Sequence, residues 1–246
     1  MSNAILFRMA SGVPGDISRR GQTTVEPVIF DGSKPFSGYG LPGKTVSGKF
    51  VPLESGDAAT VVDGFLARPY PIQTANADGS GVSTLKCGDR VRRGYMTVKC
   101  NAGTPAVAGQ VYTRVGNPSS GKPIGGIEAA SEVAAVGAAT GGNTGNGTIG
   151  TVSATSAAIT GVYKATMTSA TAFTVQDPNG VQLKAGATGT AYTCEGATFT
   201  ITVGGTPMIA GDSFTVTVTP GTVPVPGAVF MDAGDASGNV EIRYNV

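Results

Sequence analysis

Carboxylates are the side chains of this sequence best suited to acid–base chemistry. The 246 residues include no histidine, which excludes a Ser-His-Asp triad and an imidazole metal site. A glycosidase-type mechanism would instead need two carboxylates facing each other. The candidates for such a pair are Asp57, Asp63, Asp89, Glu128, Asp232, Asp235 and Glu241. All except Glu241 fall at predicted turns, where carboxylates normally cap and solvate the chain, so we predict that the protein is not an enzyme.

Cysteines and glycines offer little further chemistry. Cys87, Cys100 and Cys194 are spaced too widely for a Cys-x-x-Cys metal or redox motif, and we expect them to be small buried apolar residues. Cys87 and Cys100 are predicted to flank a strand pair and to face each other across it. The glycine-rich run 141–147 has no Lys-Ser/Thr ending and no following helix, so it does not predict a phosphate loop. We therefore predict no metal and no cofactor.

Arginine clustering points to an interface with another protein. Arginine and tyrosine are favoured at protein–protein contacts, although a solvated strand edge would also explain charges at these positions. A segment bounded by Gly and Pro, residues 13–21, is either disordered or ordered against a partner. The candidate interface residues are Pro14, Asp16, Arg19 and Arg20 in this segment, and Arg90, Arg92, Arg93 and Tyr95 further along the chain.

Overall charge limits the possible partners. The chain has 17 basic and 16 acidic residues, so its net charge is +1. Proteins that bind nucleic acids or membrane surfaces need a clustered positive field. No run of about 18 apolar residues is present to cross a membrane. We therefore expect neither nucleic acid nor membrane as a partner.

The elements that position these residues are predicted to be strands. Val, Thr, Ile and Ala dominate the apolar positions, and no helix of 10 or more residues is predicted. Pro and Gly separate the candidate strands of residues 1–130, and a turn at 235–239 separates two strands near the end of the chain. The predicted strands are 5–9, 24–29, 49–52, 59–67, 92–98, 110–114, 227–231 and 239–244.

A change in composition predicts two domains. Residues 131–220 hold 20 threonines and only 6 charged residues. Threonine alternates there with apolar residues at 163–168, 171–175, 197–203 and 213–218. About seven short strands in 90 residues are typical of an immunoglobulin-like β-sandwich. We predict an all-β protein in which an irregular or jelly-roll-like β-barrel, residues 1–130 and 223–246, carries an inserted Thr-rich immunoglobulin-like β-sandwich, residues 131–222.

Particular segments resemble the structural cement proteins of tailed bacteriophage heads. These are residues 7–19 (FRMASGVPGDISR), 92–98 (RRGYMTV), 226–231 (PGAVFM) and 236–245 (ASGNVEIRYN). The resemblance covers about 1–128 and 223–246. Residues 143–152, 173–180 and 199–205 are similar to a module appended to several phage head decoration proteins.

The resemblance implies a structural protein of the virion. On this basis we expect a non-enzymatic protein, made in the host cytoplasm, that binds the outer surface of the head. It would bridge subunits of the major capsid protein, its expected partner. Because small decoration proteins of this kind assemble as trimers or, less often, as dimers, the resemblance also implies a homo-oligomer, with a trimer favoured and a dimer as the alternative.

Two other functions stay open at this point. The protein could be a tail- or fibre-associated adhesin whose immunoglobulin-like module binds host-surface carbohydrate. It could also be a hydrolase of bacterial wall polymer, which would require the carboxylate pair described above in a cleft.

Overall fold

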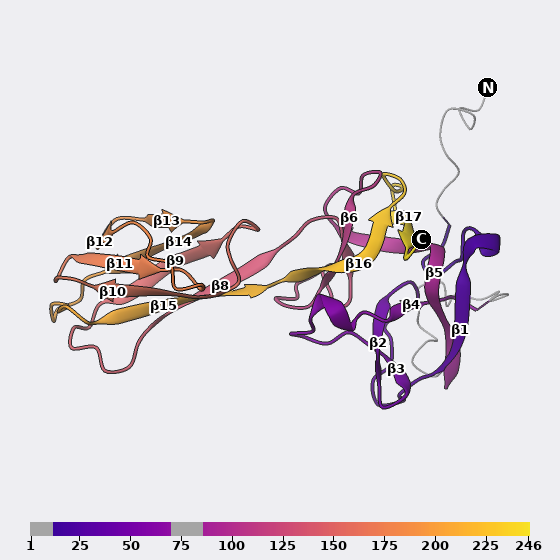
Figure 1. Ribbon diagram of the computed structural model, residues 1–246, viewed down its shortest axis with the longest axis horizontal. Coiled ribbons are helices and arrows are strands. Elements are labelled where there is room, and N and C mark those ends of the chain that lie inside the picture. The colour runs from indigo at the N-terminus through magenta and orange to yellow at the C-terminus, as the bar shows by residue number, and fades with distance from the viewer. Residues whose placement is uncertain (1–11, 70–85) are drawn as a thin grey trace, which may run out of the picture. The chain divides into compact units, whose positions relative to one another are not determined.

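The computed structural model describes residues 12–69 and 86–246, and these residues form two compact units (Figure 1). Unit 2 is Glu132–Gly221, and unit 1 comprises Thr222–Val246 and the described residues up to Ser131. The prediction of an all-β protein is confirmed, because strands dominate both units. The described residues contain only two short 3-10 helices, η2 (Arg20–Gln22) and η3 (Ala59–Val61). None of the helices in that part of the chain is long and apolar enough to span a bilayer.

Unit 1 contains a closed barrel of five strands. Each strand pairs with two neighbours in the cyclic order β5, β17, β16, β6, β7, and only the β5–β7 pair is parallel. Alternate residues of these strands, among them Met96, Val98, Ile242 and Phe230, are buried inside. The strands are β5 (Cys87–Ala102), β6 (Gln110–Arg114), β7 (Ile127–Glu128), β16 (Thr222–Phe230) and β17 (Asn239–Tyr244).

The first half of β5 also belongs to a second sheet. There it lies between β1 (Thr24–Ile29) and β4 (Gly64–Leu66), and the sheet continues through β2 (Pro42–Val46) to β3 (Lys49–Pro52). A bridge between Phe30 and Phe50 brings β1 and β3 together, so this sheet nearly closes around an aromatic core. Gly94 separates the two halves of β5. Its φ of +133° and the 2.2 Å between a Cβ at this position and Thr23 Oγ1 leave room for glycine alone.

Unit 2 is a sandwich of two antiparallel sheets. One sheet has the order β12-β11-β10-β15-β8, and the other has the order β13-β14-β9. Their inner faces enclose one core that includes Tyr163, Phe173, Phe199 and Phe214. The immunoglobulin-like identity of this sandwich stays a prediction. The strands are β8 (Val133–Ala139), β9 (Thr148–Ala154), β10 (Gly161–Met167), β11 (Ala172–Gln176), β12 (Gly186–Ala187), β13 (Tyr192–Cys194), β14 (Ala197–Thr202) and β15 (Ser213–Pro220).

The two ends of unit 2 lie side by side. β8 enters the unit and β15 leaves it, and the two strands pair antiparallel from Val133↔Pro220 to Ala139↔Phe214. Beyond the strands, the N–H of Gly221 donates to the carbonyl of Glu132 at 2.8 Å. The chain therefore enters and leaves unit 2 at neighbouring positions.

The cysteine prediction was wrong in two respects. Cys87 and Cys100 lie in one strand, β5, near its two ends, and therefore cannot face each other across a strand pair. Cys87 is exposed and Cys100 half-buried, and only Cys194 is buried; all three are free thiols. The sequence interpretation failed because Arg92–Val98 was taken as a short strand, whereas ladder pairing on both sides extends it over Cys87–Ala102.

Candidate functional site

Residues 13–18 lie along the outside of the barrel, against β5. The N–H of Gly15 donates to the carbonyl of Thr97 at 2.8 Å, and the N–H of Thr97 donates to the carbonyl of Asp16 at 2.9 Å. Ile17 forms an antiparallel bridge with Met96. Gly15 has a φ of +91°, and a Cβ there would lie 2.6 Å from the Cβ of Tyr39, so the backbone can approach this closely only with glycine. The candidate segment is thus ordered against its own barrel.

Arg19 fastens the end of this segment to β17. Its guanidinium makes two hydrogen bonds to Glu241, at 3.2 Å from Nε and 3.0 Å from Nη2, and Ser18 Oγ donates to the same carboxylate at 2.6 Å. The hydrogen bond to Glu241 raises the pKa of Arg19. The guanidinium also lies 4.2 Å from the ring centroid of Tyr95, which is buried. Since its side chain is 44% exposed, Arg19 keeps one face toward solvent.

Pro14 and Asp16 also have roles within the segment. Asp16 accepts a hydrogen bond from Arg68 Nη1 at 3.2 Å and one from the N–H of Val13 at 3.3 Å. Pro14 is half-buried and packs close to Gly40, whose added Cβ would lie 3.4 Å from the carbonyl carbon of Pro14. These contacts hold the turn at residues 13–16, from which the chain continues alongside β5.

Arg90 and Arg92 belong to a network with two carboxylates. Arg90 Nη2 lies 2.6 Å from Glu26 Oε2, and Nη1 of the same side chain contacts Asp63. Arg92 also contacts the carboxylate of Asp63 and donates to the Asp63 carbonyl at 2.9 Å. Two arginines and two acids balance each other, so this part of the cluster has no net charge to offer a partner.

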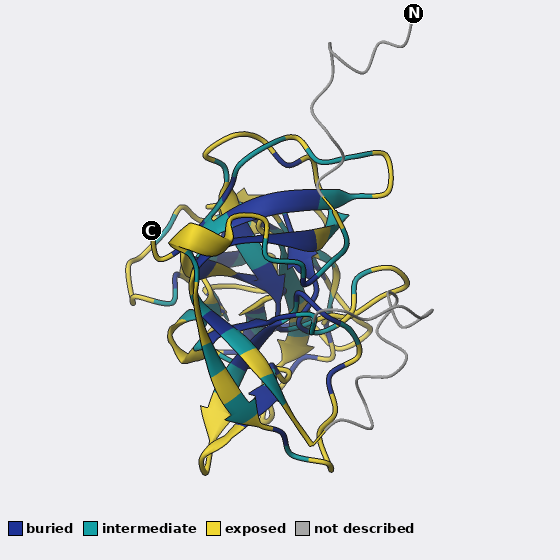
Figure 2. Cartoon of the chain, turned by 90° about the vertical axis from the view of Figure 1, so that its right-hand side faces the viewer, coloured by how far each residue is buried: buried dark blue, intermediate teal, exposed yellow. Residues whose placement is uncertain are grey.

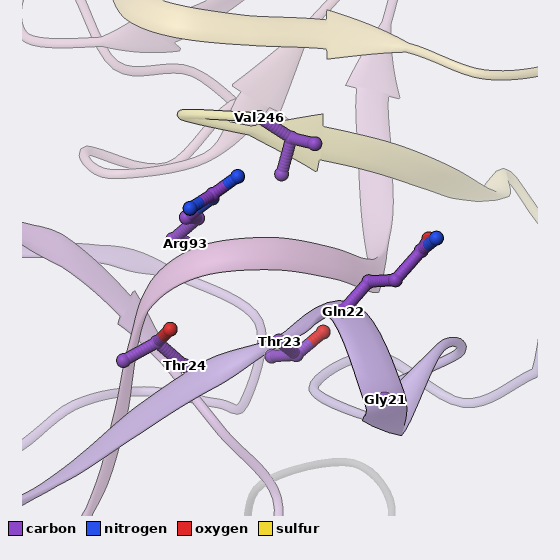
Figure 3. A pocket seen from close by; sticks show the side chains of 6 residues that line it. All are labelled: Gly21, Gln22, Thr23, Thr24, Arg93 and Val246. Atoms are coloured by element: carbon purple, nitrogen blue, oxygen red, sulfur yellow. The ribbon is translucent and has the colours of Figure 1, made fainter.

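Arg93 lies apart from that network, at a shallow depression. The depression has a volume of about 360 Å³ and is lined by Gly21, Gln22, Thr23, Thr24, Arg93 and Val246 (Figure 3). Figure 3 shows the Arg93 side chain extending toward Val246. Arg93 is exposed and, within the described residues, makes no ion pair. It therefore presents an unneutralised positive charge at a polar depression.

Arg20 lies beside this depression. It begins η2, the exposed turn that is yellow in Figure 2, and the other residues of η2 line the depression. The structure thus divides the eight candidates. Arg90, Arg92, Asp16 and Arg19 make ion pairs or hydrogen bonds within the chain, and Tyr95 is buried against Arg19. Arg93, in contrast, is exposed at the depression, with Arg20 nearby in the chain turn that borders it.

The carboxylates considered for catalysis are mostly committed to structural contacts. Asp63 pairs with arginines, Asp57 lies 2.8 Å from Lys44 Nζ, and Glu241 binds Arg19. Asp232 and Asp235 accept backbone N–H groups in their own turns. Asp89 and Glu128 lie in β5 and β7, so the prediction that both fall at turns was wrong. Among the described residues, no group of three or more His, Cys, Asp or Glu side chains could hold a metal ion.

The sequence interpretation missed one buried ion pair. Arg114 on β6 is fully buried and donates to both carboxylate oxygens of Glu128 on β7, at 2.5 and 2.9 Å. Its remaining nitrogen Nη1 donates to the carbonyls of Gly116 and Asn117. The pair fixes the loop between the two strands. Only the pairing of β6 with β7 brings the charges together, and a two-residue strand gives little sequence signal.

Comparison with known proteins gives one family. Residues 1–152 match the family described as "XM1 gp53 minor capsid protein". No curated protein matches the chain.

Among solved structures, similarity is found to flagellar proteins. A crystal structure of FlgL from Xanthomonas campestris has 24% identity and a TM-score of 0.30, over 37% of this chain and 30% of FlgL. The flagellar junction protein FlgL from Legionella pneumophila has 16% identity and a TM-score of 0.28, over 78% of this chain and 50% of FlgL. The chain thus spans half or less of the length of these proteins.

Proposed function

The chain belongs to the XM1 gp53 minor capsid protein family, and from that membership we propose that it is a decoration, or cement, protein of the phage head. On this proposal it binds the outer surface of the capsid and bridges neighbouring major capsid subunits. Membership alone establishes a structural protein of the phage capsid. The match over residues 1–152 carries the proposal, because it includes residues 13–20 and β5, which hold the candidate interface residues.

The charge of unit 2 supports a position on the outside of the head. Unit 2 has two basic and four acidic residues in its 90 positions. The interior of a filled head is occupied by DNA, and proteins in contact with DNA neutralise phosphates with clustered Lys and Arg. A Thr-rich sandwich with few charges and more acidic than basic residues gains nothing from contact with DNA and is well suited to water.

The capsid contact is proposed at the depression beside Arg93. Arg90 and Arg92 are neutralised by Glu26 and Asp63, so a partner gains little from their charge. Arg93 is exposed and has no ion pair within the described residues, and Gln22 and Thr24 lie beside it. A guanidinium with neighbouring amide and hydroxyl groups fits a carboxylate, to which arginine makes paired hydrogen bonds. The partner surface is therefore proposed to present an acidic side chain.

Charge reversal at Arg93 tests this contact. The full chain would be added to undecorated heads over a range of concentrations, and bound protein measured by co-sedimentation. R93E is expected to weaken binding by about tenfold or more, because like charges then meet at the interface. The matched control is K99E, which changes an exposed cation of the same strand. Equal binding by R93E and the unaltered chain would contradict the assignment of this depression.

Location on the particle tests the decoration role independently. Heads lacking tails would be purified and imaged by cryo-EM. The proposal expects density for both units on the outer surface, between neighbouring major capsid subunits. Density only on tails would instead support the adhesin alternative, and density only inside the head would overturn the decoration role.

A further inference from the structure

Strand β8 of unit 2 has an open edge that lacks the usual protection against pairing with another strand. It ends the five-stranded sheet: β8 is hydrogen-bonded to β15 on one side and to no described strand on the other, while Gly137 on it packs against Ile149 and Val152 of β9. It has seven residues, Val133–Ala139, and all seven are in uninterrupted register with β15. It contains no charged residue and no proline. Natural proteins usually block such edges, because unpaired backbone groups template another strand.

The other edge strands of unit 2 are each protected. β12 has two residues and β13 has three, which is too short for extended pairing. β9 is interrupted, because Thr151 has a φ of +51° and the register with β14 shifts between Thr198 and Thr200. Short strands and bulges are established ways of blocking an edge.

The edge strands of unit 1 are also protected. β1 carries Glu26 and Pro27, and β3 carries Lys49 and Pro52. Charges and prolines prevent edge-to-edge pairing, the latter because proline has no N–H to donate. Among the described edge strands, β8 is thus the one that is long, regular and uncharged.

The hydrogen bonds next to β8 define which of its groups are free. The N–H of Gly221 donates to the carbonyl of Glu132, and the N–H of Thr140 donates to the carbonyl of Ser213. In an antiparallel pair, alternate residues direct both backbone groups to the same neighbour. The even-numbered residues of β8 therefore face β15. Val133, Ala135, Gly137 and Ala139 direct their N–H and C=O groups to the open edge.

We propose that this edge pairs with β8 of a second copy of the chain, antiparallel and about a two-fold axis through Val136. In this register Ala135 lies opposite Gly137 of the other copy, and Val133 lies opposite Ala139. All four residues whose backbone groups face the open edge then form hydrogen-bonded pairs. The two Val136 residues meet at the centre as a non-hydrogen-bonded pair, with Cα atoms about 4.5 Å apart.

Charge and side-chain size are the reasons for assigning a second copy of the chain, rather than another protein, as the partner of this edge. Residues 133–163 contain no charged residue, so two identical strands meet without like-charge repulsion, and a charged partner strand would gain no ion pair. Val136 is 69% exposed, and its side chain would be covered by its counterpart in the other copy. Ala134 and Ala138 on the same face are small, so they leave room for the second strand.

Cross-linking at the axis tests the register. The variant V136C would be made in the full chain with C87S, which removes the exposed native thiol. A Cα separation of about 4.5 Å is within the range for a disulfide, so a covalent dimer is expected after oxidation with glutathione disulfide. The matched control is T217C, beside Val136 on the inner strand β15, where the two copies would lie about 14 Å apart. Absence of the V136C dimer, or equal yields from the two variants, would overturn the register.

Charge at the axis tests the association itself. Light scattering of the full chain is expected to give twice the mass of 24.5 kDa, and V136E is expected to give 24.5 kDa because two carboxylates would then meet. T217E should keep the doubled mass. A monomeric unaltered chain, or any oligomer that V136E leaves intact, would overturn the proposal. This outcome is separate from head binding, which depends on unit 1.

Discussion

Replacing Arg114 with methionine should destabilise unit 1 severely. The Arg114 and Glu128 side chains are 0% and 2% exposed, and two hydrogen bonds join them. R114M keeps the approximate volume but leaves a buried carboxylate without its counter-charge. Breaking a buried pair in this way lowers the free energy of unfolding by about 3–5 kcal/mol. The carbonyls of Gly116 and Asn117 also lose a donor, which adds to the same loss.

Urea unfolding followed by hydrogen–deuterium exchange measures this effect. Mass spectrometry separates peptides of β6 and β7 from those of unit 2, so the transition of unit 1 is followed alone. With an m-value of about 1–3 kcal/mol per molar urea, the midpoint of R114M should fall by roughly 1–5 M. The double variant R114M/E128M should recover a large part of this loss, because a buried pair replaced by apolar side chains leaves no uncompensated charge.

A surface pair supplies the control for this prediction. Lys34 and Glu54 are joined at 2.7 Å, but their side chains are 44% and 46% exposed. K34M should leave the urea midpoint nearly unchanged, because exposed ion pairs contribute little. A loss below about 1 kcal/mol for R114M, or a double variant as unstable as the sum of the single ones, would refute the reasoning.

Two further predictions concern unit 2. Excising Glu132–Gly221 and joining Ser131 to Thr222 with a short Gly-Ser linker should leave unit 1 folded and able to bind heads, because the two ends of unit 2 are adjacent. Circular dichroism and co-sedimentation check this, and an insoluble or non-binding product would contradict it. The second prediction is acid sensitivity. Hydrogen bonds from backbone N–H groups, the strongest of them from Ile209, lower the pKa of the Asp212 carboxyl. The ionised carboxylate therefore stabilises the fold above about pH 4, and this stabilisation is lost as the pH falls through the lowered pKa. Thermal unfolding from pH 2 to 6 should show a smaller acid loss for D212N, and parallel curves for the two proteins would exclude this role for Asp212.

The sequence alone determined where most strands lie. Alternation with a period of two comes from the pleat of each strand, so it is visible without knowledge of the partner. The predicted strands 24–29, 49–52, 110–114 and 239–244 coincide with β1, β3, β6 and β17. The predicted strand 5–9 lies outside the described residues. Where alternation is weak, prediction failed: β2 begins with Pro-Gly, β7 has two residues, and β8 is built from Ala, Val and Gly.

Only the tertiary structure decided what the charged residues do. In the sequence, Arg19, Arg90, Arg92 and Arg93 are equivalent candidates for an interface. Folding places Glu241, which is 222 positions away, against Arg19, and places Asp63 against Arg90 and Arg92. Arg93 makes no ion pair with any residue in the described part of the chain. The physical reason is that periodicity is a local property of the backbone, whereas an ion pair depends on which distant strands become neighbours. A sequence read residue by residue therefore locates strands and charges, and the sheet order decides which charges are available to a partner.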